Sequence, residues 1–123
     1  MTHHRCIISL ASNCDAEKNL PEARLCLEQI LFDCKYSDAI WTEPVGTKRK
    51  DPYLNQLVKG TTTLTLDELN ARLKTIEQQM GRNSEDRQQG IVRMDLDTLL
   101  YDEKRYHERD WDRPYVATLL PQL

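Results

Sequence analysis

Two aspartates, Asp95 and Asp97, stand one residue apart in the otherwise apolar stretch RMDLDTLLY at residues 93–101. Side chains alternate between the two faces of a strand, so these carboxylates are expected to lie side by side. Adjacent carboxylate oxygens suit a hard divalent cation such as Mg²⁺. The alternative is a solvated strand face that happens to carry two acids.

Arg93 lies two residues before Asp95, which predicts the same strand face. A planar guanidinium binds carboxylates in a bidentate manner, so Arg93 could form an internal salt bridge in place of a metal site. The other interpretation is that Arg93 contacts a phosphate group beside the metals.

Tyr53 and Asn55 show the same spacing in the stretch PYLNQLV at residues 52–58. An aromatic ring and an amide are therefore expected in one pocket, where the amide supplies a hydrogen-bond donor and an acceptor. The alternative is a cross-strand aromatic pair, with Asn55 capping a turn.

Two helices are predicted from capping patterns. Asn19 and Glu22 have the N-cap and N3 spacing, with Pro21 in the first turn, which predicts a helix over residues 20–32. Thr65 and Glu68 form a capping box, apolar residues then recur at helical spacing, and Gly81 is placed to end this second helix.

Four strand-like stretches surround these helices, at residues 5–11, 34–42, 53–64 and 93–101. The resulting order βαββαβ predicts an α+β, ferredoxin-like fold: one antiparallel sheet with both helices on one face. The opposite face is expected to be open for a ligand. A length of 123 residues predicts a single domain.

The composition limits the classes of partner. Lys and Arg number 17 against 20 Asp and Glu, a net charge of −3, so we expect no nucleic-acid partner. No apolar run is long enough for a membrane span. Four cysteines without a CxxC pair, and a start without a long apolar signal core, predict a cytoplasmic protein.

Ordered motifs extend these predictions. The segments TEPVG at residues 42–46, PYLNQLV at 52–58, IEQQMGR at 76–82 and MDLD at 94–97 follow one another. In this order and spacing the chain resembles the hydroxymethyl-dihydropterin pyrophosphokinases of folate biosynthesis, from about residue 8 to its end. The resemblance implies one pyrophosphokinase-like domain over residues 1–123.

The resemblance also implies an activity. It is the transfer of pyrophosphate from ATP to the hydroxymethyl group of a pterin, with release of AMP. The reaction would use two Mg²⁺ ions as cofactors. Asp95 and Asp97 would be the metal ligands, and Arg82 would contact a phosphate. All three would be catalytic. The implied pterin site consists of Thr42, Val45, Tyr53, Asn55 and Tyr115. The implied nucleotide site consists of Glu77, Arg82, Arg93, His107 and Arg113.

Several positions depart from the family pattern on the nucleotide side. Ala11 replaces a motif glycine, Ser84 stands where a second arginine is usual, and Gln89 and Ile91 replace the tryptophan and proline of a WGPR motif. The segment at residues 102–106 is shorter than the family's, which predicts the loss of an edge strand. The alternative function is therefore a catalytically degraded relative that binds a pterin or a protein partner. An exposed sheet edge would also permit a homodimer.

Overall fold

The computed structural model describes residues 2–44, 51–81 and 83–123, and it is built around one antiparallel sheet with the strand order β2-β4-β1-β5-β6. A further short strand, β3, also pairs with β4. The strands are β1 His4–Ser12, β2 Phe32–Tyr36, β3 Ile40–Thr42, β4 Tyr53–Thr62, β5 Asp95–Tyr101 and β6 Lys104–Arg105. The helices are α1 Ala16–Leu27, α2 Leu66–Gln79, α3 Ser84–Gln88, α4 Glu108–Trp111 and α5 Pro114–Leu119, followed by a 3-10 turn at Leu120–Gln122.

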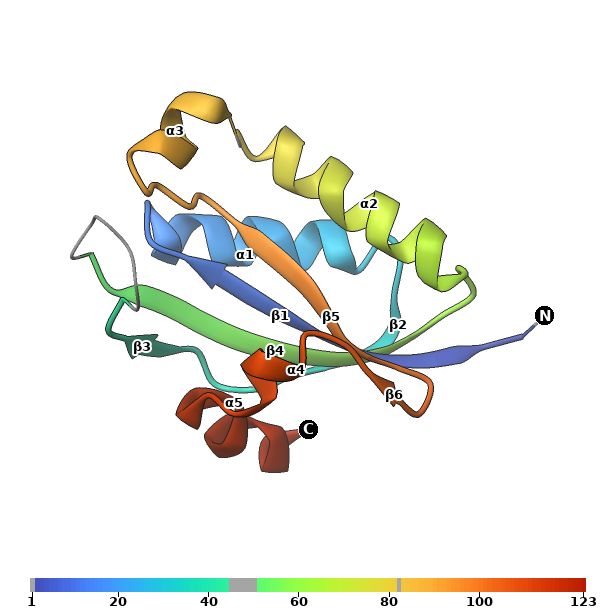
Figure 1. Ribbon diagram of the computed structural model, residues 1–123. Helices are drawn as coiled ribbons and strands as arrows, with labels where there is room; N and C mark the ends of the chain where they lie inside the picture. The colour runs from blue at the N-terminus through green and yellow to red at the C-terminus, as the bar shows by residue number, and fades with distance from the viewer. Residues whose placement is uncertain (1, 45–50, 82) are drawn as a thin grey trace.

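The predicted ferredoxin-like α+β class is confirmed. Helices α1 and α2 cover one face of the sheet (Figure 1), as the βαββαβ order requires. The long predicted strand at residues 34–42 is divided into β2 and β3. Between them, Ser37 accepts a hydrogen bond at its Oγ from the Leu57 amide, 2.9 Å away, and its own amide donates to the Leu57 carbonyl. The chain therefore stays on the edge of β4 although the regular ladder is interrupted.

The start of α1 differs from the prediction. The helix begins at Ala16 after Asp15, whose backbone is left-handed with φ 48, so Asn19 lies inside the helix rather than at its N-cap. The Asn19 amide instead donates to the carbonyls of Cys14, at 2.8 Å, and Arg93, at 3.1 Å. It thereby links α1 to the segment that enters β5.

Helix α2 follows its sequence pattern closely. Thr65 accepts a hydrogen bond from the Glu68 amide and the Glu68 carboxylate accepts one from the Thr65 amide, which completes the predicted capping box. The helix ends at Gln79, and Gly81 beyond it has φ 100, a conformation that glycine adopts without strain.

Replacing Thr65 by alanine is expected to lower the free energy of unfolding by about 1 kcal/mol, because the side-chain oxygen that caps α2 is lost. Urea unfolding followed by circular dichroism measures this change. The matched control is Thr75→Ala on the exposed face of the same helix, and an equal loss in both variants would contradict a specific role of the cap.

The apolar core lies on both sides of the sheet. The larger cluster, which includes Ile8, Leu10, Leu69 and Leu96, is packed between the sheet and the helices α1 and α2. A smaller cluster on the opposite face consists of Ile7, Leu57, Leu99, Val116 and Leu119. The C-terminal helices α4 and α5 thus cover part of the face that was expected to be open (Figure 1).

The edge beyond β5 also corrects the prediction. A short edge strand, β6, is present although the segment after Tyr101 is abbreviated, and Arg105 pairs with Leu100. In the part of the chain that the structure describes, no helix combines the length and apolarity needed to cross a membrane.

Candidate active site

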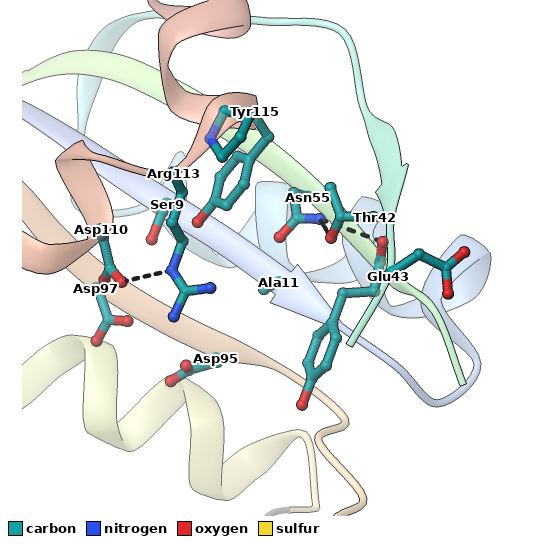
Figure 2. A pocket seen from close by; sticks show the side chains of 12 residues that line it. Ser9, Ala11, Thr42, Glu43, Asn55, Asp95, Asp97, Asp110, Arg113 and Tyr115 are labelled. Atoms are coloured by element: carbon teal, nitrogen blue, oxygen red, sulfur yellow. Dashed lines mark hydrogen bonds and ion pairs between the residues drawn. The ribbon is translucent and has the colours of Figure 1, made fainter. Parts of the chain in front are cut away.

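A pocket of about 470 Å³ opens on the sheet face opposite α1 and α2 (Figure 2). The pairing of the strands determines which residues form the floor of the pocket. Ala11 of β1 pairs with Asn55 on one side and Asp95 on the other, so these three residues form a row across the sheet. The small side chain of Ala11 leaves room between the amide and the carboxylate. The lining is Ser9, Ala11, Thr42, Glu43, Tyr53, Asn55, Asp95, Asp97, Asp110, Arg113, Pro114 and Tyr115.

The two aspartates of β5 share the pocket face, as their spacing predicts. Both are partly exposed, whereas Leu96 between them is buried in the core on the opposite face. The Leu96 amide donates a hydrogen bond of 2.8 Å to Oε2 of Glu77 on α2. Packing and hydrogen bonding on the helix side of the sheet therefore hold β5 in place. This strand presents the two carboxylates on the pocket side.

Asn55 is almost completely buried, at 3% exposure, beside Thr42. Its amide nitrogen donates to Thr42 Oγ1 at 2.7 Å and to the Tyr53 carbonyl at 3.2 Å. The β3–β4 pairing produces this contact, because Ile40 lies opposite Asn55 and Thr42 lies opposite Tyr53. A polar edge with fixed geometry therefore forms one wall of the pocket.

The ring of Tyr53 lies next to this wall. Partial burial, and then the charge of Asp95, raise the pKa of Tyr53 above its usual value. Its hydroxyl is therefore protonated at neutral pH. The aromatic face and the carboxylate belong to the same cavity.

The C-terminal segment supplies the opposite wall. Tyr115 and Arg113 line the pocket, and Arg113 Nε lies 3.1 Å from Asp110 Oδ1 (Figure 2). Burial, followed by the charge of Asp110, raises the pKa of Tyr115 to about 12. Tyr115 therefore presents a neutral ring and hydroxyl.

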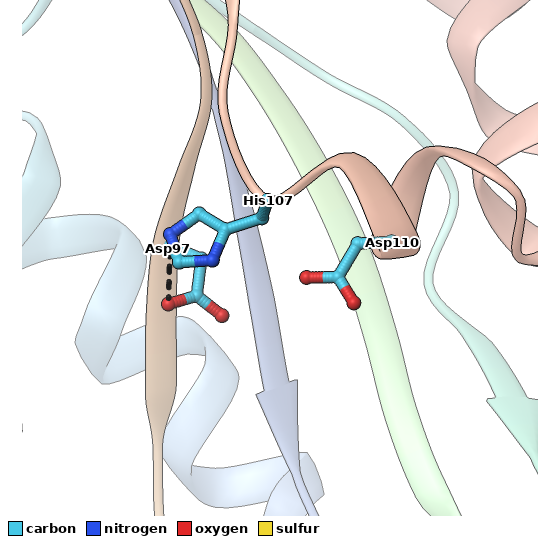
Figure 3. Close-up of side chains that lie close together, drawn as sticks. All are labelled: Asp97, His107 and Asp110. Atoms are coloured by element: carbon cyan, nitrogen blue, oxygen red, sulfur yellow. Dashed lines mark ion pairs between the residues drawn. The ribbon is translucent and has the colours of Figure 1, made fainter.

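His107 lies beside Asp97, next to the pocket. Its Nε2 is 3.7 Å from Asp97 Oδ1, and Figure 3 shows the two side chains together with Asp110. His107 precedes α4 in a left-handed backbone conformation with φ 55. The structure thus brings the predicted residue His107 beside Asp97.

Arg93 and Glu77, both predicted on the nucleotide side, make contacts within the protein. Strand β5 begins only at Asp95, so Arg93 does not follow the alternation that predicted its face. Among the described residues its ion pair is with Asp86 of α3, at 2.7 Å, which corrects the predicted pair with Asp95 and Asp97. Glu77 is buried on the helix side of the sheet.

Two other predicted residues, Val45 and Arg82, lie outside the described residues. Four lining residues were missed by the sequence analysis: Ser9, Glu43, Asp110 and Pro114. Asp110 follows His107 by three residues, a spacing that places both on one side of a helical turn. Ser9 is two residues before Ala11 on the first strand, so alternation could have paired them, but the strand register was needed to bring Ser9 opposite Asp97.

The chain is similar in sequence to folate synthesis bifunctional proteins of plants. Two proteins of Arabidopsis thaliana, a folate synthesis bifunctional protein and a mitochondrial folate synthesis bifunctional protein, are 33% and 36% identical over 99% of this chain. A mitochondrial folate synthesis bifunctional protein of Pisum sativum is 33% identical over 95% of it. The chain spans 27%, 24% and 24% of these relatives, about a quarter of their length. A cytoplasmic location for this chain stays a prediction.

A family model described as 7,8-dihydro-6-hydroxymethylpterin-pyrophosphokinase matches residues 7–123. The matched range includes every strand of the sheet except the first residues of β1, and it contains all the residues that line the pocket. The chain therefore belongs to the 7,8-dihydro-6-hydroxymethylpterin-pyrophosphokinase family.

Proposed function

We propose that this protein transfers pyrophosphate from ATP to the hydroxymethyl group of 6-hydroxymethyl-7,8-dihydropterin, with release of AMP, in folate biosynthesis. The observation that carries the proposal is that Asp95 and Asp97 share one pocket with the Asn55 wall and lie across Ala11 from it. A site for a cation is thus adjacent to a site for a flat polar heterocycle. The family to which the chain belongs supports the same activity.

The donor set fits magnesium. Asp95 and Asp97 offer carboxylate oxygens on one face of β5, and Mg²⁺ is usually bound by one or two carboxylates together with waters and substrate phosphates. When bound, two Mg²⁺ ions would neutralise the phosphate charge and orient the reacting oxygens. The role of the protein residues is to hold those ions beside the pterin.

The pterin would occupy the space between the Asn55 wall and Tyr115. The amide nitrogen of Asn55 is engaged by Thr42 and by backbone carbonyls, which orients its amide oxygen as an acceptor for the pterin amino group. Tyr53 and Tyr115 would contact the ring faces. Backbone groups near Val45 would complete the contacts to the polar edge of the pterin.

The phosphates would lie at the side of the aspartates, where Arg113 and His107 are candidates for contact. Arg82, which is outside the described residues, stays a predicted phosphate contact. The pterin hydroxyl oxygen would then lose its proton to solvent and form a bond to the β-phosphorus, while the bond from that phosphorus to the oxygen of the α-phosphate breaks and AMP leaves. Positioning of the two substrates accounts for much of such catalysis.

Isothermal titration with 6-hydroxymethylpterin and a non-hydrolysable ATP analogue, each with and without Mg²⁺, tests the two halves of the site. We expect both to bind, the nucleotide only with the metal, and we expect AMP to form when ATP and the dihydropterin are both present. Pterin binding without nucleotide binding or AMP formation would contradict the proposal and indicate a non-catalytic relative.

Replacing Asn55 by alanine is expected to weaken pterin binding about tenfold, because one buried hydrogen-bonding group of the pocket is lost. The affinity for the ATP analogue should change less than the pterin affinity and serves as the internal control. Titration of both ligands against the variant measures the difference. Equal losses for both ligands would contradict the assignment of this wall to the pterin.

A homodimer is also proposed, through an exposed sheet edge. β2, β3 and β6 are the outer strands of the described sheet, and Trp41 on β3 is 51% exposed. Sedimentation at several protein concentrations measures the oligomeric state.

A further inference from the structure

Three potential metal-ligating side chains converge beside the pocket. One ligand atom from each of Asp97, His107 and Asp110 lies within 4.8 Å of the other two, and Figure 3 shows the imidazole and both carboxylates on the same side of β5. They are partly accessible, with side-chain exposures of 29%, 49% and 23%. An ion from solvent could therefore reach them.

The three side chains are held by two connected elements. Asp97 is on β5, whereas His107 is the N-cap of α4 and Asp110 lies within that helix. Trp111 fixes α4 against the strand, because its Nε1 donates to the carbonyls of Leu99, at 3.2 Å, and Tyr106, at 3.0 Å. The cluster is therefore largely preformed.

This set of three ligands differs from the pair of Asp95 and Asp97 because it includes the imidazole of His107. Mg²⁺ prefers oxygen ligands only, whereas one imidazole nitrogen with carboxylates suits first-row transition-metal dications. Ligand atoms bonded at roughly 2.0–2.2 Å to one ion lie roughly 3–4 Å apart, so the cluster needs only a small contraction. Partly exposed side chains can make such a movement.

We propose that Asp97, His107 and Asp110 form a binding site for a transition-metal dication such as Co²⁺ or Zn²⁺. The site requires neither substrate, so metal binding to it can be measured separately from the proposed transfer reaction. It shares Asp97 with the proposed magnesium site, and Asp110 now accepts a hydrogen bond from Arg113. Occupancy would therefore compete with Mg²⁺ for Asp97 and with Arg113 for Asp110.

Titration of the metal-free protein with Co²⁺, without ATP or pterin, tests the site by calorimetry and by visible absorption of the bound ion. We expect one Co²⁺ per chain at this site, with affinity reduced at least about tenfold in His107→Gln and in Asp110→Asn, since each loses a ligand. The matched control is Asp112→Asn, an exposed aspartate at the end of α4 that is outside the cluster, and it should bind as the unmodified protein does.

The N-terminal histidines need a second control, since His3 and His4 are the other two histidines of the chain. A variant with both replaced by glutamine should keep the binding and the absorption spectrum. Absence of Co²⁺ binding, binding that disappears with His3 and His4, or binding that survives His107→Gln would overturn the proposal. None of these outcomes bears on AMP formation, which is measured separately with Mg²⁺.

Discussion

Asp97→Asn and Asp95→Asn are each expected to lower kcat for AMP formation by about 10³-fold or more. Each removes one carboxylate charge from the proposed magnesium site, and metal stabilisation of a phosphoryl-transfer transition state is worth several kcal/mol, with about 1.4 kcal/mol for each tenfold in rate. Asparagine keeps the shape of aspartate, so the melting temperature should change by only a few degrees. A coupled assay of AMP at saturating Mg²⁺, combined with thermal unfolding, measures both effects.

Pterin affinity should be retained in both variants, because the Asn55 wall lies across Ala11 from the carboxylates. Asp112→Asn provides the control for loss of an aspartate elsewhere in the chain and should leave kcat unchanged. Full activity in Asp95→Asn and Asp97→Asn would rule out the proposed metal site. A large loss of thermal stability with metal binding preserved would instead indicate that the aspartates are structural.

The sequence pattern predicted those features that depend on residues close together in the chain. Thr65 and Glu68 satisfy each other's backbone amides within one turn, so the start of α2 can be predicted from four residues. The shared face of Asp95 and Asp97 follows from strand alternation alone. The same is true of Asn55 and Tyr53, which the structure places in one pocket.

Contacts between residues far apart in the sequence determine the features that the local sequence pattern did not predict. Asn19 has the type and spacing of an N-cap, but its amide bonds to the Cys14 and Arg93 carbonyls, and α1 starts earlier. Arg93 has the spacing of a strand residue, but it precedes β5 and pairs with Asp86. In both cases the partner is decided by the packing of α1, α3 and β5, not by neighbours along the chain.

The second wall of the site depends on the C-terminal segment, which is dense in charged and aromatic residues and has no clear period. Its helices are short, and its position on the sheet depends on a small apolar cluster that includes Val116 and Leu119. The packing of this cluster against the sheet brings Asp110 and Arg113 to the pocket. Asp110 was missed in the sequence for this reason, although its spacing from His107 is helical.

Glu77 illustrates how a residue of a family motif can act below the site and not in it. The residue is 5% exposed, and its carboxylate accepts a hydrogen bond from the amide of Leu96, which lies between the two aspartates. Through this bond α2 fixes the part of β5 that carries Asp95 and Asp97. We therefore propose that Glu77 is a positioning residue, in place of the predicted contact with the nucleotide.

Glu77→Ala is expected to lower the free energy of unfolding by about 1–3 kcal/mol, since a buried backbone amide loses its acceptor. It should also lower kcat up to about 10²-fold, because a displacement of about 1 Å at the aspartates would misalign the reacting groups. Glu77→Gln keeps an oxygen acceptor and should recover most of the stability and part of kcat. Urea unfolding and the AMP assay measure the two effects on the same preparations.

The neighbouring exposed residue Gln78 supplies the control, because Gln78→Ala changes α2 without altering the bond to β5. A direct nucleotide contact by Glu77 predicts a different result: a higher KM for ATP in Glu77→Ala with unchanged stability, and no recovery of stability in Glu77→Gln. The positioning role instead requires stability and kcat to fall together, since one hydrogen bond holds both the strand and the carboxylates that it presents.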